Sequence, residues 1–204
     1  MLTPDDLLLA ARWAGRRFAL VPDEMWERPA PDWTPRRTLD HLVDTLELYA
    51  ASVRTRATAR LDPPRDGDPG ASRAELVAQL TLTAEKLAGL LAGMDDDERA
   101  LHPSGLADRT GWLGMAATEV LVHTREACGP DPDDDALEPL AAAVVGRVLP
   151  WTPPGDGWAR LLQGTGRAPL GDVPPAGADW WWHSAPLAEW DGAPRRRSSP
   201  PQWR

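Results

Sequence analysis

The sequence predicts an all-α protein built as a helix bundle. Three observations favour this class. Apolar residues recur at spacings of three and four over long stretches, helix-capping signals flank these stretches, and the alternating pattern of strands is almost absent before residue 150. A chain of 204 residues is long enough to bury one sizeable core. We therefore expect helices with up-and-down connections, packed around that core.

Two helices near the N-terminus begin with the same signal, a threonine followed by a proline. The first starts at Thr3-Pro4 and is expected to reach about Val21, and the second starts at Thr34-Pro35 and is expected to reach about Thr58. Threonine caps free N–H groups of the first turn, and proline is tolerated there because its missing N–H would have no partner. The apolar stripe of the second helix consists of Leu39, Leu42, Val43, Leu46, Ala50 and Val53.

Three further helices follow before residue 150. Ser72 and Glu75 form a capping-box pattern, in which each side chain satisfies a backbone N–H near the other residue. A glycine-proline pair ends the next helix, since proline cannot continue it. The segment before that helix, through Pro103, has no regular pattern. The expected bounds are 72 to about 93, Gly111 or Trp112 to Cys128, and Asp133 to Leu149.

The character of the chain changes after Pro150. Ten of the 22 prolines lie from that residue onward, and glycine is also frequent there. We expect a bundle domain over residues 1–150 and an irregular Trp/Pro-rich extension over 151–193, with one short helix near 158–163, packed on the bundle. Residues 194–204 are expected to form a disordered tail.

Composition narrows the functional classes. A net charge of −9 and a pI near 4.9 disfavour binding to nucleic acid, because the phosphate backbone would be repelled. No apolar run approaches the roughly 20 residues of a membrane helix. The N-terminal residues do not form a secretory signal, and Cys128 is the only cysteine, which excludes an internal disulfide. We expect a cytoplasmic protein that binds neither nucleic acid nor membrane.

A carboxylate and an imidazole lie four residues apart in the helix expected over 111–128. Glu119 and His123 therefore project from one face, beside apolar residues such as Trp112 and Met115. An unpaired carboxylate on such a face is costly, and a metal ion or a protonated partner would remove that cost. The spacing alone does not decide between a metal site and an ordinary pair.

His41 is the natural third ligand, although periodicity does not select it. It lies off the main apolar stripe of its helix, alongside Asp44, Thr45 and Ser52. It is either a half-exposed histidine on a polar face or a ligand in a pocket between two helices. Helix bundles commonly build their metal sites in such pockets.

Two segments carry a resemblance to a known family. They are Trp33-Thr34-Pro35-Arg36-Arg37-Thr38-Leu39-Asp40-His41-Leu42 and Glu119-Val120-Leu121-Val122-His123-Thr124. Together they resemble the DinB-like superfamily, specifically its mycothiol-dependent maleylpyruvate isomerase type, over roughly residues 2–129. The resemblance implies a four-helix bundle and a divalent metal, normally zinc, held by His41, Glu119 and His123.

A site with three protein ligands retains a coordination position for another molecule, as catalytic zinc sites do. Coordination removes the proton of a thiol. The resemblance therefore implies a mycothiol-dependent transferase or isomerase acting on a small electrophile, with a small-molecule substrate and a low-molecular-weight thiol as partners. Two alternative functions remain open: a non-enzymatic metal- or ligand-binding member of the fold, and a metal-dependent hydrolase. Assembly as a homodimer also remains open.

Several other residues have two interpretations. Glu126 lies on the ligand face and could orient a ligand histidine from behind, whereas Arg125 points away and is expected at the surface. Trp180-Trp181-Trp182 with Trp190 could roof a substrate pocket or simply pack on the bundle, and packing is the simpler reading.

The remaining titratable candidates are weaker. His183 could contact substrate or be hydrogen-bonded where it lies, and His102 is expected to be exposed in a loop. Cys128 lies at a helix C-terminus, where the helix dipole disfavours a thiolate, so it is a poor nucleophile.

Overall fold

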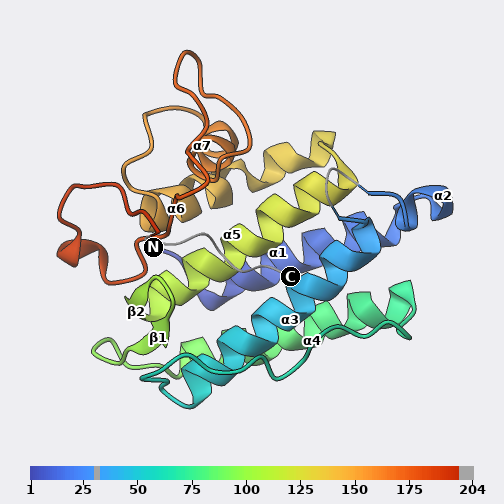
Figure 1. Ribbon diagram of the computed structural model, residues 1–204, viewed down its shortest axis with the longest axis horizontal. Coiled ribbons are helices and arrows are strands. Elements are labelled where there is room, and N and C mark those ends of the chain that lie inside the picture. Colours follow the sequence, from blue (N-terminus) through green and yellow to red (C-terminus); the bar gives the residue numbers. More distant parts are fainter. Residues whose placement is uncertain (30–32, 198–204) are drawn as a thin grey trace.

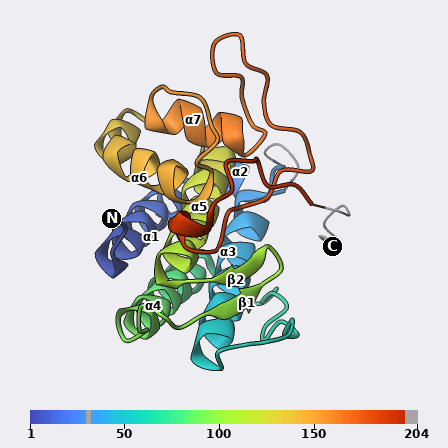
Figure 2. The ribbon, with the colours of Figure 1, turned by 90° about the vertical axis from the view of Figure 1, so that its left-hand side faces the viewer.

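Four long helices form the body of the protein (Figure 1). The computed structural model describes residues 1–29 and 33–197. The bundle helices are α1 (Pro4–Ala19), α3 (Pro35–Arg54), α4 (Arg73–Ala92) and α5 (Arg109–Cys128). Both α1 and α3 pack against α4 and α5, so the four helices surround a common core, as the end-on view in Figure 2 shows. The predicted all-α class is confirmed.

The helices begin where the capping residues place them. Thr34 Oγ1 accepts from Arg37 N–H at the start of α3, and the capping box of Ser72 opens α4. Helix α5 begins at Arg109, two or three residues earlier than predicted, because Asp108 is its cap and accepts from Gly111 N–H at 2.9 Å. Helix α3 ends four residues earlier than predicted, where Arg56 adopts a φ of 47° that a helix cannot contain.

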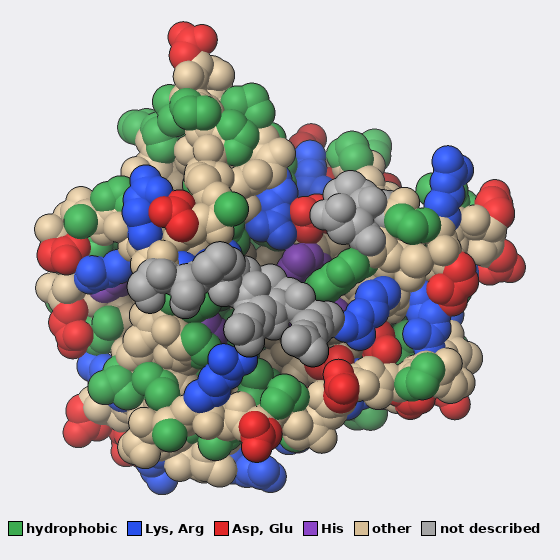
Figure 3. Space-filling model, viewed as in Figure 1, with side chains coloured by type: hydrophobic (Ala, Val, Ile, Leu, Met, Phe, Trp, Pro, Cys, Tyr) green, Lys and Arg blue, Asp and Glu red, His purple; other side chains and the backbone are tan. Residues whose placement is uncertain are grey.

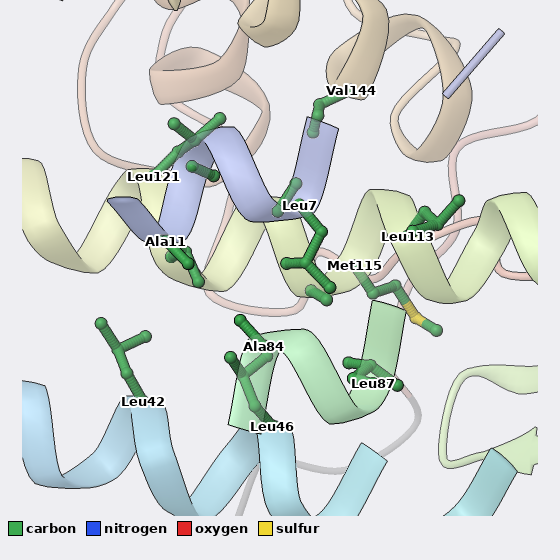
Figure 4. Packing of buried hydrophobic residues seen from close by; sticks show 14 of the residues in the cluster. Leu7, Ala11, Leu42, Leu46, Ala84, Leu87, Leu113, Met115, Leu121 and Val144 are labelled. Carbon is green, nitrogen blue, oxygen red and sulfur yellow. The ribbon is translucent and has the colours of Figure 1, made fainter. Parts of the chain in front are cut away.

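The core is a continuous set of leucine, alanine, valine and aromatic side chains. Figure 4 shows leucines of α3 facing alanine and leucine of α4, with side chains of α1 and α5 completing the layer. The labelled residues are Leu7, Ala11, Leu42, Leu46, Ala84, Leu87, Leu113, Met115, Leu121 and Val144. Helix α5 is buried on almost every side, so a polar group on it must find a partner inside the protein.

A short hairpin fills the segment that was expected to be irregular. Strands β1 (Ala100–His102) and β2 (Gly105–Ala107) pair antiparallel at the N-terminal end of α5 (Figure 1). Strands of three residues are too short to show the alternating pattern that identifies a strand in a sequence. Another short element, α2 (Asp23–Trp26), was also not expected.

The expectation that His102 is exposed is wrong. The hairpin turns this side chain inward, and only 6% of the residue is accessible. Its ring meets those of Tyr49 and Trp112 edge-on, with centroids 5.4 and 5.6 Å apart. Ser104 N–H donates to Nδ1 at 3.1 Å, which satisfies the imidazole inside an aromatic cluster.

The predicted fifth helix is divided into two elements. A 3-10 segment, η1 (Pro132–Leu137), precedes α6 (Glu138–Val148), and Pro139 in the first turn of α6 explains the break because proline favours a helix start. Helix α6 packs on α5, and α7 (Gly157–Gly164) packs on α6. No helix in the described ranges is long and apolar enough to cross a membrane.

The extension shares the core of the bundle. Trp158 and Trp182 are buried, and Trp158 lies against Trp13 with ring centroids 6.0 Å apart. After a further 3-10 turn, η2 (Leu187–Glu189), residues 195–197 run beside 179–181 through backbone hydrogen bonds from Trp181 N–H and Arg197 N–H. The predicted disordered tail began at 194, and its last seven residues, 198–204, lie outside the described part of the chain.

Candidate metal centre

Helix α5 supplies two of the candidate ligands from its buried face. Glu119 and His123 are one turn apart, and Glu119 Oε2 lies 3.1 Å from His123 Nε2. Only 7% of the Glu119 side chain and 20% of the His123 side chain are exposed. A carboxylate at this depth requires a positive partner, which the imidazole supplies when it is protonated.

Helix α3 brings the third candidate ligand to the same point. His41 Nε2 lies 4.0 Å from Glu119 Oε2, and its side chain is 14% exposed. One ligand atom from each of His41, Glu119 and His123 lies within 4.8 Å of the others. His41 therefore faces α5, and of its two interpretations the position in a pocket between two helices is the one that agrees with the structure.

The two histidines have opposite proton affinities in the protein without an ion. Burial is the main cause that lowers the pKa of His41 to about 4. Burial also opposes protonation of His123, but hydrogen bonds to Glu119 and Glu126 outweigh it and raise the pKa of His123 to about 9. Burial opposes the ionisation of Glu119, but the hydrogen bond to His123 and the positive charges around it outweigh burial and lower the pKa of Glu119. A metal ion could replace the proton that His123 shares with Glu119.

Glu126 supports the site from behind, as its position on the ligand face suggested. Its Oε2 lies 3.0 Å from His123 Nδ1, which leaves the opposite nitrogen, Nε2, directed at Glu119. Arg167 in turn holds Glu126, with Nε 2.9 Å from Oε1 and Nη2 3.2 Å from Oε2. These contacts, from Arg167 through Glu126 to His123, hold the imidazole in one orientation. Metal-bound histidines commonly have such a partner behind them.

Trp33 forms an aromatic wall beside both histidines. Its ring stacks on His123 at a centroid distance of 6.0 Å and meets His41 edge-on at 4.7 Å. The indole limits where each imidazole can turn. Trp33 is also the first residue of the sequence segment that carries the family resemblance.

The candidate ligands lie at one side of a cavity of about 270 Å³. Helices α3 and α5 form one wall, and the extension forms the other through Thr165, Arg167, Trp180, Trp181, Trp182 and Arg197. Figure 3 shows imidazole groups within a hollow on this face, bordered by basic and hydrophobic side chains. A small molecule could therefore reach the ligand atoms from outside.

Other candidates lie away from the cavity. His183 hydrogen-bonds Pro186 O at 3.0 Å, which is the simpler of its two interpretations. Trp190 donates to Ala193 O and does not line the cavity, unlike the three consecutive tryptophans. Arg125 pairs with Asp134 at 2.6 Å. Burial raises the pKa of Cys128 to about 12, which agrees with its poor prospects as a nucleophile.

Sequence reasoning missed Arg167 and Arg197. Both lie in the irregular extension, where no periodicity predicts which side chains face inward. The one available signal was Glu126, because a carboxylate on the ligand face, beside apolar residues, favours a cationic partner.

Comparison with known families matches residues 11–127 to the model of the DinB superfamily. This is more than half of the chain. The chain belongs to the DinB superfamily. A search among curated proteins gave no match. The part matched to the DinB superfamily contains His41, Glu119 and His123, whereas the extension that forms the other wall of the cavity lies outside it.

The residues of this DinB superfamily member fit a divalent ion. Two imidazole nitrogens and one carboxylate oxygen are the donor types that zinc accepts. The buried Glu119 supplies negative charge, and Glu126 holds the far nitrogen of His123. The donor set and its support therefore fit a bound divalent ion.

Proposed function

We propose that this DinB superfamily member is an enzyme that binds one divalent ion, most suitably zinc, through His41, Glu119 and His123. It uses the ion to activate a low-molecular-weight thiol for attack on a small electrophile, as a transferase or an isomerase. The resemblance of the sequence favours mycothiol as that thiol. The observation that carries the proposal is the meeting of these three donors at the wall of an accessible cavity.

The number of protein ligands supports a catalytic site over a structural one. Structural zinc sites have four protein ligands, whereas catalytic sites have three and accept an outside molecule. Among the described residues, the cluster of His, Cys, Asp and Glu contains three members. A divalent ion held there would lower the pKa of a coordinated thiol, which supplies a thiolate at neutral pH.

The protein's own residues prepare this chemistry. Glu126 keeps a hydrogen bond at His123 Nδ1, so that Nε2 is the nitrogen available to an ion. Trp33 and the tryptophans of the extension bring apolar surface to the cavity. Apolar walls exclude water, which would otherwise compete with the thiol for the electrophile. The walls also bind the apolar body of a substrate.

Cobalt substitution tests the proposal, because thiolate coordination to cobalt produces a strong absorption band. We expect the purified protein to contain about one ion per chain, and His41→Ala and His123→Ala variants to lose it. Mycothiol should then change the spectrum of the cobalt protein, whereas the same concentration of 2-mercaptoethanol should change it less.

Two outcomes would contradict the proposal. Equal metal content in the folded variants and the wild type would remove the metal centre. Metal binding without any spectral response to mycothiol would remove the thiol chemistry and leave a hydrolase or a non-enzymatic binding protein. Circular dichroism of each variant checks that the helices remain folded.

A further inference from the structure

One arginine of the extension uses all three of its guanidinium nitrogens for contacts within the protein. Arg167 Nε donates to Glu126 Oε1 at 2.9 Å and Nη2 donates to Glu126 Oε2 at 3.2 Å, so two contacts hold one carboxylate. The third nitrogen, Nη1, donates to Thr165 O at 2.6 Å. A two-point contact fixes the direction of a carboxylate as well as its distance. Arg167 is therefore committed to Glu126 although it lines the cavity.

The turn after α7 sets the direction of this arginine. Gly166 has a φ of 79°, and a Cβ atom there would lie 2.9 Å from Ala176 O, so the turn requires glycine. Arg167 N–H then donates to Leu162 O at 2.7 Å, and Ala176 N–H donates to Gln163 O at 2.8 Å. These backbone contacts anchor the segment on α7 and direct the Arg167 side chain toward α5.

Glu126 lies between this arginine and a candidate ligand. Its Oε2 is 3.0 Å from His123 Nδ1 and accepts from Arg167 Nη2 as well. Burial opposes the ionisation of Glu126, but the hydrogen bonds from His123 and Arg167 outweigh burial and lower the pKa of Glu126 to about 2. Glu126 is therefore a carboxylate at neutral pH, and both of its partners determine where it points.

Arg167 has two opposite effects on a cation held by His123. Its positive charge repels a cation. Its hydrogen bonds also hold Glu126 in place, and a carboxylate fixed behind a histidine favours a cation on the far nitrogen of the ring. The charge of Glu126 offsets most of the repulsion, because the carboxylate is in direct contact with the guanidinium. We therefore expect the effect on orientation to be the larger one.

We propose that Arg167 is a positioning residue of the metal centre that acts on His123 through Glu126, a role that rests on the proposed function for the presence of the ion. Glu126 and His123 lie within the part that matches the DinB superfamily, residues 11–127, whereas Arg167 lies beyond it. The extension therefore contributes to the metal centre as well as to the wall of the cavity.

Zinc affinity separates orientation from charge, because the two effects have opposite signs. Arg167→Gln removes the charge and the two-point contact, whereas Arg167→Lys keeps the charge and loses the contact. Competition with a chelating dye should show a dissociation constant for zinc that is roughly tenfold higher in Arg167→Gln, and also higher in Arg167→Lys. Arg196→Gln is the matched control and should bind zinc like wild type, because Arg196 also pairs with a carboxylate, Asp179, but does not line the cavity.

A Glu126→Gln background shows whether Arg167 acts through Glu126. With the carboxylate removed, Arg167→Gln should no longer weaken zinc binding, and the loss of repulsion should slightly strengthen it. Two results would overturn the role of Arg167. One is zinc binding by Arg167→Gln that equals or exceeds that of wild type. The other is an equal loss of affinity with and without Glu126.

An NMR signal of the imidazole tests the same contacts without an ion. The hydrogen bond to Glu126 should slow the exchange of the His123 Nδ1 proton with water, so that isotope-labelled histidine gives a downfield proton signal in wild type. Arg167→Gln should broaden this signal, whereas Arg196→Gln should retain it. An unchanged signal in Arg167→Gln would show that Glu126 holds the ring unaided, which also overturns the proposal. Circular dichroism checks the fold, and Arg167→Lys provides the same comparison if Arg167→Gln does not fold.

The outcome is separable from that of the proposed function. A wild-type protein that binds no zinc would reject the proposed function, but the imidazole signal would still show whether Arg167 positions His123. A zinc affinity that depends on Arg167, with no response of the cobalt protein to mycothiol, would keep the positioning role and reject thiol activation. A response to mycothiol with equal zinc affinity in Arg167→Gln and wild type would do the reverse.

Discussion

Individual side chains set the affinity of the candidate metal centre for an ion. Burial keeps His41 neutral near pH 7, since the pKa of this group is lowered to about 4. Glu126 determines the orientation of His123 through its hydrogen bond to Nδ1. Neither effect is visible from the three ligand identities alone, and both act on the affinity of the site.

Removal of the negative charge behind His123 should weaken metal binding. In Glu126→Gln the amide still fits, but the charge that supports the imidazole is lost. We expect the dissociation constant for zinc to rise roughly 10- to 100-fold, as for other partners of metal-bound histidine. Competition with a chelating dye measures this. Glu85→Gln, an exposed change on α4, is the control, and an equal constant in both variants would contradict the role of Glu126.

The buried His102 should make stability fall in acid. Burial lowers the pKa of His102 to about 3, whereas its value in an unfolded chain is about 6.5. Between these values the unfolded state binds a proton that the folded state does not. The free energy of unfolding therefore decreases as pH falls from 6.5 toward 3, with a slope from this group of about 1.4 kcal/mol per pH unit.

A His102→Asn variant isolates this contribution, because the other histidines are unchanged. Urea unfolding at several pH values should give a steeper loss of stability for wild type than for the variant. Parallel curves between pH 6.5 and 4 would show that His102 is not held neutral in the fold.

Among the elements, the N-terminus of α5 joins the bundle to the extension. Asp108 caps the helix and pairs with the buried Arg147 of α6. Arg147 also donates to His183 O at 3.1 Å and to Ala185 O at 2.9 Å. One ion pair therefore ties α5, α6 and the loop after the three tryptophans together.

Loss of the Asp108 charge should destabilise the protein by about 3 kcal/mol, because a buried cation is left without its counter-ion. Asn is an equally good cap, so Asp108→Asn changes the charge alone. Asp96→Asn is the control, since Asp96 pairs with Arg109 at the surface and surface pairs contribute little. Equal urea midpoints for the two variants would contradict the inference.

The helices could be predicted from sequence because local signals define them. Capping residues placed the starts of α1, α3 and α4 correctly, and the start of α5 was placed too late because the cap Asp108 was overlooked. The hairpin was missed because three-residue strands carry no periodic signal. The wrong expectation that His102 is exposed has the same cause, because the missed hairpin is what turns this side chain inward.

The candidate ligands could be predicted, but only by resemblance for His41. Glu119 and His123 lie on one helix face, whereas His41 comes from another helix and its direction depends on packing. Arg167 and Arg197 belong to irregular segments whose path is set by tertiary contacts. Local sequence contains no information of that kind.

At the scale of the whole molecule, the extension forms one wall of the cavity because it packs closely against the bundle. Gly111 in the first turn of α5 allows this approach. A Cβ atom at this position would lie 2.0 Å from Ser184 O and 3.0 Å from the carbonyl carbon of the same residue. The backbone after the three tryptophans therefore rests directly on the start of α5.

A methyl group at Gly111 should displace the extension without touching the ligands. We expect Gly111→Ala to lose about 1 to 3 kcal/mol of stability, as is usual for overpacking, while zinc stoichiometry remains one per chain. Gly146→Ala is the control, because a Cβ there meets no atom within 4 Å and alanine favours a helix. Comparable stability of the two variants would show that the contact at Ser184 is easily relaxed.

The wall formed by the extension has a consequence for how relatives of this protein could diverge. The three ligands lie within the part that matches the superfamily, whereas Arg197 and the tryptophans lie beyond it. Substitutions in the appended segment can therefore reshape this wall of the cavity while the three candidate ligands stay unchanged. The wall contributed by the extension and the candidate ligands therefore lie in separate stretches of the sequence, and each can change without the other.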